Sequence, residues 1–389
     1  MRISVFGSTG SIGTQTLEVA RHLGIEVAVL AAGSNVDKLA EQVASLRPRF
    51  AAMYDREASS RLKEIILAEG LPTRVVDGRR AMSELASYDG SDKVVNAVVG
   101  SAGLAVSLSA LNAGKPLALA NKESLVAAGS LMVEASKAHN AAILPVDSEH
   151  SAIWQCMWSS AGAGVEEIML TASGGPFRGR KDLSGIRPED ALKHPTWDMG
   201  KKISIDSATM INKALEVIEA RWLFDVDADR IKVVVHPQSI VHSAVMFTDG
   251  SVIAQMGAPD MRLPIMAALC YPGRSSVHAP GSGKLDLAQV GSLSFERPDT
   301  DTFPGVTLGH RALRRKGLAP AAMSAANEEA VAQFLSGNIP FTMIAGLCEE
   351  AMEASSESEP SSLEEVLEAD LKARSYVESR CRSWRSCHS

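Results

Sequence analysis

The stretch ISVFGSTGSIGTQTLEVARHL, residues 3–23, decides the fold of the first part of this chain. A short apolar strand, Ile3–Phe6, leads into a loop with glycines at positions 7, 10 and 13, and a helical pattern follows over Thr14–Leu23. A glycine loop between a strand and a helix is where a dinucleotide pyrophosphate binds at a helix N-terminus. Because the spacing is G-x-x-G-x-x-G rather than G-x-G-x-x-G, a tight turn without a ligand is the alternative.

The alternation of strands and helices continues to about residue 147. Further strands are predicted at 27–31, 94–98, 117–120 and 143–146, and further helices at 36–46 and 123–139. Such alternation predicts a parallel, doubly wound sheet of the Rossmann type.

The end of the second predicted strand bears on the choice of cofactor. An NAD site places Asp or Glu there to hold the ribose 2′-hydroxyl. Here the strand runs into Ala32-Gly33-Ser34-Asn35, without a carboxylate but with two small polar donors. This favours NADP over NAD, with Lys38 or Arg56 as further candidates for the 2′-phosphate.

The rest of the chain changes character twice. Strand-like runs at 167–171, 233–235, 243–247 and 251–255 lie among turn residues, and helical patterns follow at 320–336 and 342–354. The predicted fold class is α/β, with an N-terminal Rossmann-type parallel sheet, a central α+β catalytic domain and a C-terminal helical domain. The predicted boundaries are 1–147, 148–275 with a lid at 193–201, a linker at 276–304, and 305–389. Residues 355–370 are predicted as a solvated acidic face with a loop, and the last nine residues as a frayed tail.

Composition excludes several classes of protein. The 389 residues carry a net charge of −7 and only 5% aromatic residues, which is not typical of a nucleic-acid-binding protein. The most apolar stretch, 94–108, is too short and too rich in glycine for a membrane span, and the first residues lack the apolar run of a signal peptide. An odd number of cysteines, without C-x-x-C, predicts reduced thiols and a cytoplasmic protein; they are Cys156, Cys270, Cys348, Cys381 and Cys387.

Two carboxylates follow the predicted strand at 143–146. In extended chain Asp147 and Glu149 point the same way, and like charges that close favour a cation between them. Oxygen ligands alone suggest Mg²⁺ or Mn²⁺. The alternative is a pair of solvated loop acids.

A second polar cluster lies within residues 207–216, which are predicted to form the start and body of one helix. Asn212 and Glu216 then share a face, with Lys213 alongside. Such a face could hold a phosphate at one end and a metal at the other, and the alternative is an exposed amphipathic helix.

Six blocks together resemble the 1-deoxy-D-xylulose 5-phosphate reductoisomerase family, which serves isoprenoid synthesis by the methylerythritol phosphate route. They are GSTGSIG (7–13), LANKESLV (119–126), PVDSEHSAI (145–153), TASGGPF (171–177), HPTWDMGKKISIDSATMINKALEVIEA (194–220) and HPQSIVHSAV (236–245). The blocks stand in the family order, whereas the residues beyond about 375 have no counterpart. The resemblance implies conversion of 1-deoxy-D-xylulose 5-phosphate to 2-C-methyl-D-erythritol 4-phosphate with NADPH and Mg²⁺ or Mn²⁺ by a homodimer.

The resemblance also assigns roles to residues. The implied metal ligands are Asp147, Glu149 and Glu216, which with Lys122 form the implied catalytic set. The implied substrate contacts are Lys122, Ser148, Glu149, Ser173, His194, Ser207, Asn212, Lys213 and Glu216. Trp197 and His242 are predicted to lie in the substrate area from their own segments, and the alternative for His242 is a structural histidine on a strand. The implied NADPH contacts are Thr9, Gly10, Ser11, Ile12, Gly33, Ser34, Asn35, Asn121, Glu123, Gly200 and Met261. Ser34 departs from those members that carry a basic residue there.

Individual side chains suit this chemistry. Lys122, after a strand, can stabilise an oxyanion or move a proton, the alternative being a solvated loop lysine. Trp197, bracketed by proline and glycine, suits a lid over the carbon skeleton, the alternative being a core tryptophan. His236 is predicted to be structural. Two other functions stay open: another metal-assisted NADP-dependent reductase of a phosphorylated carbonyl compound, and a non-catalytic NADP-sensing protein.

Overall fold

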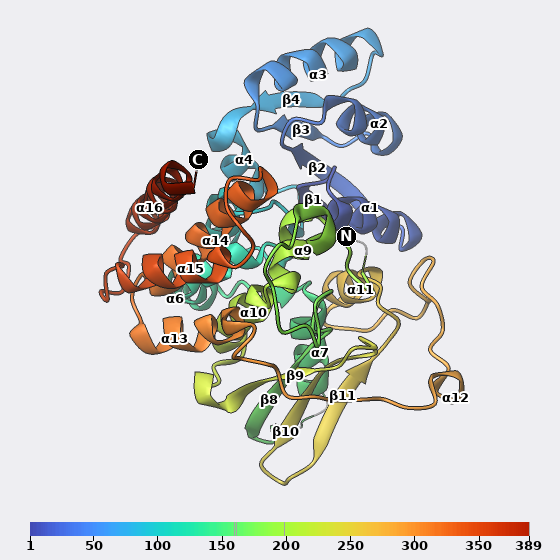
Figure 1. Cartoon of the computed structure of the whole chain (residues 1–389). Coiled ribbons are helices and arrows are strands. Elements are labelled where there is room, and N and C mark those ends of the chain that lie inside the picture. Colours follow the sequence, from blue (N-terminus) through green and yellow to red (C-terminus); the bar gives the residue numbers. More distant parts are fainter. Residues whose placement is uncertain (159, 161, 198, 389) are drawn as a thin grey trace. The chain divides into compact units, whose positions relative to one another are not determined.

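A computed structural model of the chain describes residues 1–158, 160, 162–197 and 199–388 (Figure 1). The chain forms two compact units. Unit 1 comprises Met1–Ser124, Met132–Ser151 and Asp260–Gly283, and unit 2 comprises Leu125–Leu131, Ala152–Pro259 and Lys284–Ser389. The domain boundaries expected from the sequence stay predictions. Asp198 of the predicted lid and Ser389 of the predicted tail lie outside the described residues.

A seven-stranded parallel sheet forms the centre of unit 1, which confirms the predicted Rossmann-type arrangement. Its strands are β1 (Arg2–Phe6), β2 (Glu26–Ala32), β3 (Phe50–Met53), β4 (Arg74–Asp77), β5 (Lys93–Asn96), β6 (Leu117–Leu119) and β7 (Ile143–Pro145). They lie in the order β4-β3-β2-β1-β5-β6-β7. The order reverses between β1 and β5, and at such a point a crevice opens outside the carboxyl ends of the strands.

Helices connect these strands. They are α1 (Ser11–His22), α2 (Val36–Leu46), α3 (Arg56–Ala68), α4 (Gly78–Ala86), α5 (Leu104–Asn112), α6 (Lys122–His139) and the first residues of α7 (Ser148–Met157). The sequence analysis leaves β3, α3, β4, α4 and α5 unassigned. The strands β3 and β4 have only four residues each, and α5 (LAVSLSALN) has apolar residues on all sides, so neither gives a clear period.

A helix from late in the sequence, α11 (Arg262–Cys270), also belongs to unit 1. Its Arg262 pairs with Glu18 of α1 at 2.8 Å. Its last turn receives the buried Lys93 ammonium, which donates to the carbonyls of Ala268 at 2.7 Å and Leu269 at 2.9 Å. These contacts fix α11 to the centre of the sheet, because Lys93 stands on β5.

Unit 2 contains a four-stranded mixed sheet in the order β11-β10-β8-β9. Its strands are β8 (Val165–Ala172), β9 (Ile231–Val235), β10 (Val241–Phe247) and β11 (Val252–Met256), close to the predicted positions. Strands β8 and β9 are parallel, and the other pairs are antiparallel.

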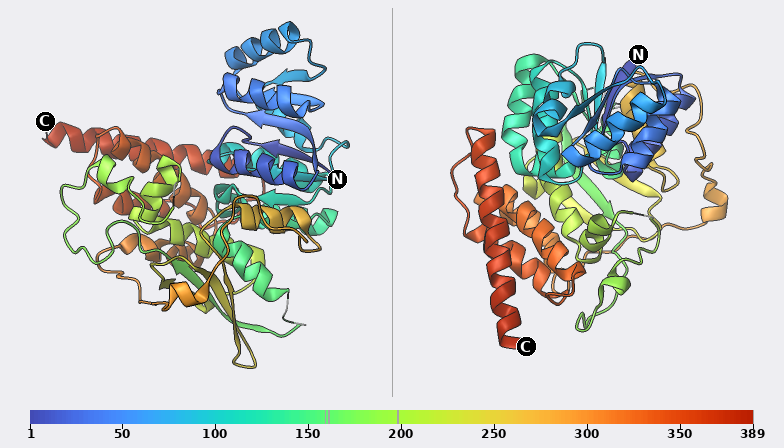
Figure 2. Two further views of the ribbon diagram at one scale, coloured as in Figure 1. Left: turned by 90° about the vertical axis from the view of Figure 1, so that its right-hand side faces the viewer. Right: turned by 90° about the horizontal axis from the view of Figure 1, so that it is seen from above.

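The remaining helices of unit 2 are α8 (Pro188–Ala191), α9 (Lys201–Ala208), α10 (Ile211–Phe224), α12 (Leu287–Val290), α13 (Leu308–Arg315), α14 (Ala319–Leu335), α15 (Met343–Glu353) and α16 (Leu363–His388). Most of them pack around α10 and α14, whereas α8 contacts α9 and the short α12 has no buried residue. Most of α14 is buried, and its small side chains allow α15 and α16 to pack closely against it (Figure 2).

The prediction of a frayed tail is wrong. The last residues continue the long helix α16, and Val366, Val377 and Cys381 are buried on one side of it. Trp384 packs partly against the same core. The apolar residues form a stripe along one side of the helix, and the arginines and serines between them make the composition of this segment look polar. The second half of the segment predicted as a solvated acidic face, from residue 363, forms the first turns of the same helix.

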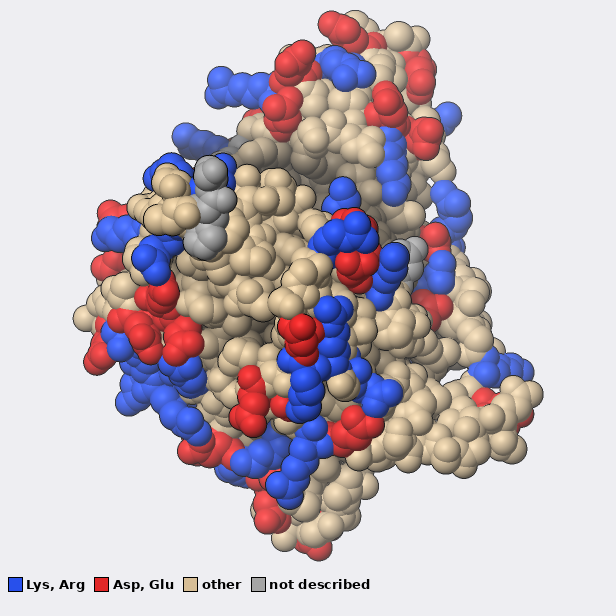
Figure 3. Space-filling model, viewed as in Figure 1, with Lys and Arg blue, Asp and Glu red and all other residues tan. Residues whose placement is uncertain are grey.

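The surface and the membrane predictions can be compared with the structure directly. On the face shown in Figure 3, acidic and basic side chains are interspersed rather than gathered by sign. Within the described residues, no helix is both long enough and apolar enough to cross a membrane. None of the five cysteines forms a disulfide in this part of the chain.

Candidate functional site

The glycine loop after β1 has the backbone geometry that a pyrophosphate site needs. Gly7 has φ of 82°, and a Cβ there would lie 2.3 Å from the carbonyl oxygen of Ala97. A Cβ on Gly13 would lie 2.2 Å from the carbonyl oxygen of Gly7. Thr9–Ile12 stay partly or fully exposed at the start of α1. The N–H groups at this helix end are therefore available to an anion.

The segment after β2 is exposed and carries no acidic residue until Asp37. Gly33, Ser34 and Asn35 all face solvent. The Asn35 side chain accepts a hydrogen bond from the backbone N–H of Lys38 at 3.1 Å, which caps α2. Its amide oxygen therefore serves the helix, and the Ser34 hydroxyl is the more accessible donor toward a ribose phosphate.

Asn121 holds a second loop of the same sheet edge. Its side-chain amide donates to the carbonyls of Val98 at 2.6 Å and Gly100 at 2.9 Å, and its oxygen accepts from the N–H of Ser124 at 3.1 Å. From within the sheet, Asn96 donates to the Gly103 carbonyl at 2.8 Å. The two asparagines thus fix the loop that follows β5, beside the glycine loop.

An ion pair lies at the carboxyl ends of β6 and β7. The Lys122 ammonium lies 2.7 Å from the Asp147 carboxylate, and both side chains are nearly buried. Nδ1 of His150 lies 3.5 Å from the same carboxylate. In low dielectric, each charge stabilises the ionised form of the other.

The predicted extended geometry of residues 147–149 is wrong, because α7 begins at Ser148. Asp147 instead stands just before the helix, and its Oδ1 accepts from the N–H of Glu149 at 3.3 Å. Glu149 contacts the Ser148 hydroxyl. The two carboxylates nevertheless offer oxygens within 4.8 Å of each other, a spacing that fits a shared hard cation.

His194 of unit 2, in the segment between α8 and α9, joins its own segment to the loop after β8. Nδ1 of His194 accepts from the N–H of Trp197 at 2.9 Å and of Thr196 at 3.2 Å. Nε2 lies 2.9 Å from Oγ of Ser173. Because Nδ1 is an acceptor, this geometry assigns the ring proton to Nε2, which donates to the serine.

The predicted single helix over 207–216 is wrong. Helix α9 ends at Ala208, α10 begins at Ile211, and Met210 between them has φ of 62°. Ser207 therefore lies in the last turn of a helix rather than the first. A Cβ on Gly175 would lie 2.6 Å from the Ser207 carbonyl oxygen, so the loop after β8 lies directly against this turn.

The first turns of α10 carry three interacting polar side chains, as the predicted i, i+4 spacing requires. The Asn212 amide donates to one oxygen of Glu216 at 2.5 Å, and the Lys213 ammonium lies 2.5 Å from the other. Lys213 and Glu216 are buried. The alternative of an exposed amphipathic helix is therefore wrong.

Four further residues that the sequence analysis names lie in unit 2. The rings of Trp197 and His242 have centroids 6.1 Å apart. Gly200 precedes the first turn of α9 and is exposed. His236 is buried, stacks on Phe295 and lies 2.9 Å from the Ser294 carbonyl, as a structural histidine would.

The predicted site residues divide between the two units. Unit 1 contains the predicted NADPH contacts other than Gly200, including Met261 just before α11, and it contains Lys122, Asp147, Ser148 and Glu149. Unit 2 contains Ser173, His194, Trp197, Ser207, Asn212, Lys213, Glu216 and His242. Their joint action on one substrate stays a proposal.

Sequence reasoning missed the buried polar residues that support these groups. Asn96 interrupts the apolar run at 94–99, and Asp206 directly precedes Ser207. Both are fully buried. A polar residue inside an apolar run was the available signal, since such a residue must find partners when it is buried.

Comparison with known proteins gives one consistent family. Residues 3–129 match the family described as 1-deoxy-D-xylulose 5-phosphate reductoisomerase, residues 143–224 its C-terminal domain, and residues 256–376 the DXP reductoisomerase C-terminal domain. The reductoisomerase of Heliobacterium modesticaldum is 50% identical over 383 residues, covering 97% of both chains. That of Symbiobacterium thermophilum is 49% identical over 376 residues, covering 96% of both.

Solved structures agree. A DOX-P reductoisomerase in complex with NADPH, fosmidomycin and magnesium has a TM-score of 0.93 and 39% identity, with 98% of both chains covered. The Zymomonas mobilis enzyme in complex with NADPH has a TM-score of 0.90 and 41% identity, with 98% of this chain and 99% of the other covered. The chain belongs to the 1-deoxy-D-xylulose 5-phosphate reductoisomerase family.

Proposed function

We propose that this chain converts 1-deoxy-D-xylulose 5-phosphate to 2-C-methyl-D-erythritol 4-phosphate, with NADPH as reductant and a divalent metal ion. One observation carries the proposal beyond family membership. The same chain has an open helix N-terminus after a glycine loop in unit 1 and a cluster of hydroxyl, amide and ammonium donors in unit 2. A dinucleotide phosphate suits the first site, and a sugar phosphate suits the second.

The proposed NADPH contacts, except Gly200, belong to unit 1. Backbone N–H groups of Ser11 and Ile12 would receive the pyrophosphate beside Gly10, whose own N–H donates to the Gly7 carbonyl at 3.1 Å. Ser34 would contact the 2′-phosphate. Asn121 holds the loop that follows β5, through the carbonyls of Val98 and Gly100, and is itself a proposed NADPH contact. Thr9, Gly33, Asn35, Glu123, Gly200 and Met261 complete the proposed contacts.

Asp147, Glu149 and Glu216 are the proposed metal ligands. A bound Mg²⁺ or Mn²⁺ would supply Lewis acidity toward the substrate ketone and a neighbouring hydroxyl. Lys122 lies 2.7 Å from the Asp147 carboxylate and therefore beside one of the proposed metal ligands. The same ammonium can hold a proton for an oxyanion that develops as the carbon–carbon bond breaks.

The substrate phosphate takes no part in bond breaking, and its binding energy orients the reacting end. Ser173, Ser207, Asn212 and Lys213 are the proposed phosphate contacts. In the structure Glu216 accepts hydrogen bonds from both Asn212 and Lys213. A bound phosphate would contact Asn212 and Lys213 instead, and a bound metal ion would contact the Glu216 carboxylate.

His194 and Trp197 belong to the proposed lid over the substrate. The histidine already organises the segment by accepting two backbone N–H groups. Trp197 and His242 would then cover the carbon skeleton and exclude water, with Ser148 as a further contact. We further propose that the protein is a homodimer in the cytoplasm, without nucleic acid or membrane partners. Size-exclusion chromatography with light scattering tests the oligomeric state.

The decisive experiment mixes purified protein, 1-deoxy-D-xylulose 5-phosphate, NADPH and Mg²⁺ or Mn²⁺, and follows the nicotinamide absorbance with and without EDTA. Metal-dependent oxidation, with 2-C-methyl-D-erythritol 4-phosphate identified as product, supports the proposal. Folded protein that binds NADPH but does not oxidise it would contradict the proposal and favour another phosphorylated carbonyl compound or a sensor.

A further inference from the structure

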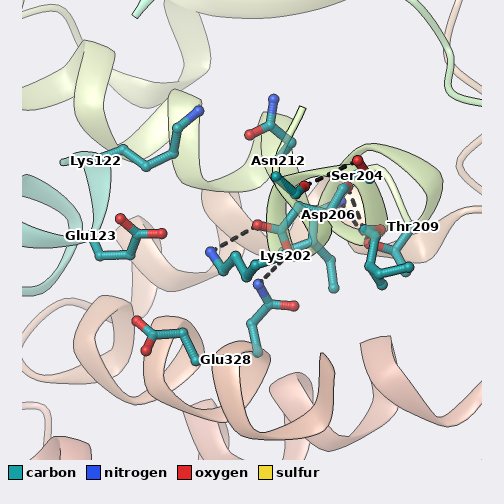
Figure 4. Close-up of polar contacts among 12 residues, drawn as sticks. Lys122, Glu123, Lys202, Ser204, Asp206, Thr209, Asn212 and Glu328 are labelled. Carbon is teal, nitrogen blue, oxygen red and sulfur yellow. Dashed lines mark hydrogen bonds and ion pairs between the residues drawn. The ribbon is translucent and has the colours of Figure 1, made fainter. Parts of the chain in front are cut away.

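A buried ionic cluster lies behind the proposed phosphate contacts of unit 2, and none of the roles above uses it. Asp206 of α9 is fully buried. One of its carboxylate oxygens accepts from the Asn327 amide of α14 at 2.7 Å, and the other lies 2.7 Å from the Lys202 ammonium one turn earlier (Figure 4). We propose that Asp206 is a positioning residue that holds the bend between α9 and α10 in the shape that binds the substrate phosphate; this inference rests on the proposed function.

The first step of the argument is the cost of burying this charge. An isolated carboxylate in the core is strongly unfavourable, and even a well-paired one contributes little to stability compared with apolar packing. The Asp206 carboxylate is fully buried and meets the polar groups of Lys202 and Asn327. A buried carboxylate that is held from α14 therefore fixes the orientation of α9 more than it adds to stability.

The second step is that the cluster reaches a third helix, α15. Asn327 also lies 4.0 Å from the Cys348 sulfur. Burial, and then the negative charge of Asp206, raise the pKa of the Cys348 thiol. The cluster therefore joins α9 to both α14 and α15 in the helical part of unit 2.

The third step connects this anchor to the bend. Successive helix residues point about 100° apart, so when Asp206 faces α14 the next side chain, Ser207, faces away from it. The Ser207 carbonyl accepts the N–H of Met210 at 3.2 Å, and the Met210 carbonyl accepts the N–H of Lys213 at 3.2 Å. Fixing Asp206 thus fixes the backbone from which the first turn of α10 starts.

The fourth step is the close fit on the other side of the bend. Thr209 donates from its hydroxyl to the carbonyls of Ile205 at 3.0 Å and Asp206 at 3.1 Å, which closes α9 before the left-handed Met210 (Figure 4). The Ser207 carbonyl meets Gly175, which leaves no room for a Cβ. A small rotation of α9 would therefore disturb both Ser207 and the loop that carries Ser173.

The experiment uses the full chain and four variants. Asp206→Asn removes the charge, and the double variant D206N/N327D exchanges amide and carboxylate, so that the pair and the net charge are kept. Asp370→Asn is the matched control, because Asp370 is also buried and ion-paired, with Arg374 at 2.6 Å on α16. Lys202→Met is the fourth variant. The readouts are KM and kcat for the substrate, competitive inhibition by inorganic phosphate, NADPH affinity by fluorescence, and thermal unfolding.

We expect Asp206→Asn to raise both the substrate KM and the inhibition constant of inorganic phosphate about ten-fold, since small misplacements of binding groups have large effects. NADPH affinity should stay within two-fold. The exchanged double variant should recover most of the loss, and Asp370→Asn should lower thermal stability without changing either constant.

Unchanged phosphate inhibition and KM in a folded Asp206→Asn variant would overturn the inference, as would an equal effect of Asp370→Asn. If Asp206→Asn does not fold, Lys202→Met decides, with a raised phosphate inhibition constant in support and an unchanged one against. If wild-type protein does not turn over the pentulose phosphate, the proposed function fails. Direct titration with inorganic phosphate, followed by ³¹P NMR, then still tests the positioning role.

Discussion

The glycine loop of unit 1 and the polar cluster of unit 2 prepare for phosphate in different ways. The loop offers backbone N–H groups, and its shape depends on places where no side chain fits, as at Gly7 and Gly13. The cluster offers side chains that are already engaged with one another, as Asn212 and Lys213 are with Glu216. A backbone site is formed before the ligand arrives, whereas a side-chain site must exchange internal partners for the ligand.

This difference has a consequence for function. A cofactor that is used at every turnover gains from a preformed site, because little has to be ordered when it binds. A substrate that must be distorted gains from a site whose charges rearrange on binding. Substitutions in the two regions should therefore separate cofactor binding from turnover.

The largest expected effect comes from removing the charge of one carboxylate. It tests whether turnover depends on carboxylate charge rather than on the backbone site. Glu149→Gln keeps the shape of a proposed metal ligand and removes its charge. We expect kcat to fall at least about 1,000-fold, equivalent to about 4 kcal/mol of transition-state stabilisation. NADPH affinity should stay within two-fold, because the glycine loop is untouched. Stopped-flow and steady-state assays with Mg²⁺ measure the loss.

Glu41→Gln is the control for that variant, since Glu41 is an exposed carboxylate of the same unit. It should leave kcat unchanged. Near wild-type turnover by Glu149→Gln would remove Glu149 from the proposed metal ligands.

The second prediction makes the converse change in the backbone site. Gly13→Ala places a Cβ 2.2 Å from the Gly7 carbonyl oxygen and 2.6 Å from Cα of Ser8, both of them backbone atoms that cannot simply rotate away. We expect NADPH affinity to fall about 100-fold and the free energy of unfolding to fall by about 3 kcal/mol. Fluorescence titration and urea unfolding measure the two effects.

Gly346→Ala serves as the comparison for that substitution. Gly346 lies within α15, and a Cβ there would meet nothing within 4 Å. Helix propensity predicts a gain of about 0.5–1 kcal/mol and unchanged NADPH affinity. Equal effects of the two substitutions would mean that the tight contact at Gly13 has no role in the cofactor site.

The third prediction contrasts the buried lysines of the two units. Lys213 has a carboxylate partner, whereas Lys93 donates to helix carbonyls, and burial lowers its pKa from 10.5 to about 8. Between these values the unfolded chain binds more protons than the folded one, so stability rises with pH through this window.

The test is the difference in free energy of unfolding between wild type and Lys93→Met, which cancels the titration of groups that are not coupled to Lys93, as Cys270 is. We expect this difference to shift by about 2 kcal/mol in favour of wild type between pH 8 and pH 10. A pH-independent difference would mean that the Lys93 ammonium keeps its ordinary pKa in the folded state.

The same contrast explains how much could be predicted from the sequence. The glycine loop and the parallel sheet could be predicted from the sequence. A backbone site requires glycines at particular positions, and a buried strand requires a run of apolar residues, so both can be recognised in the sequence. The break at Met210 could not be predicted, since a non-glycine residue in a left-handed conformation has no sequence signal. Asp206 was missed for a related reason, because its partner Asn327 lies 121 residues away.

The smallest expected effect concerns the proposed lid of unit 2. Trp197 is held by its backbone, through His194, and its ring lies near His242. Trp197→Ala removes the ring but keeps that backbone contact, so the segment should keep its shape and lose only its cover over the substrate. We expect kcat/KM to fall about ten-fold, or about 1.4 kcal/mol, with unchanged thermal stability. Trp197→Phe should recover most of the activity, because a ring of similar placement still excludes water. If both variants match wild type, Trp197 covers nothing during turnover, and the contribution of unit 2 reduces to its phosphate cluster.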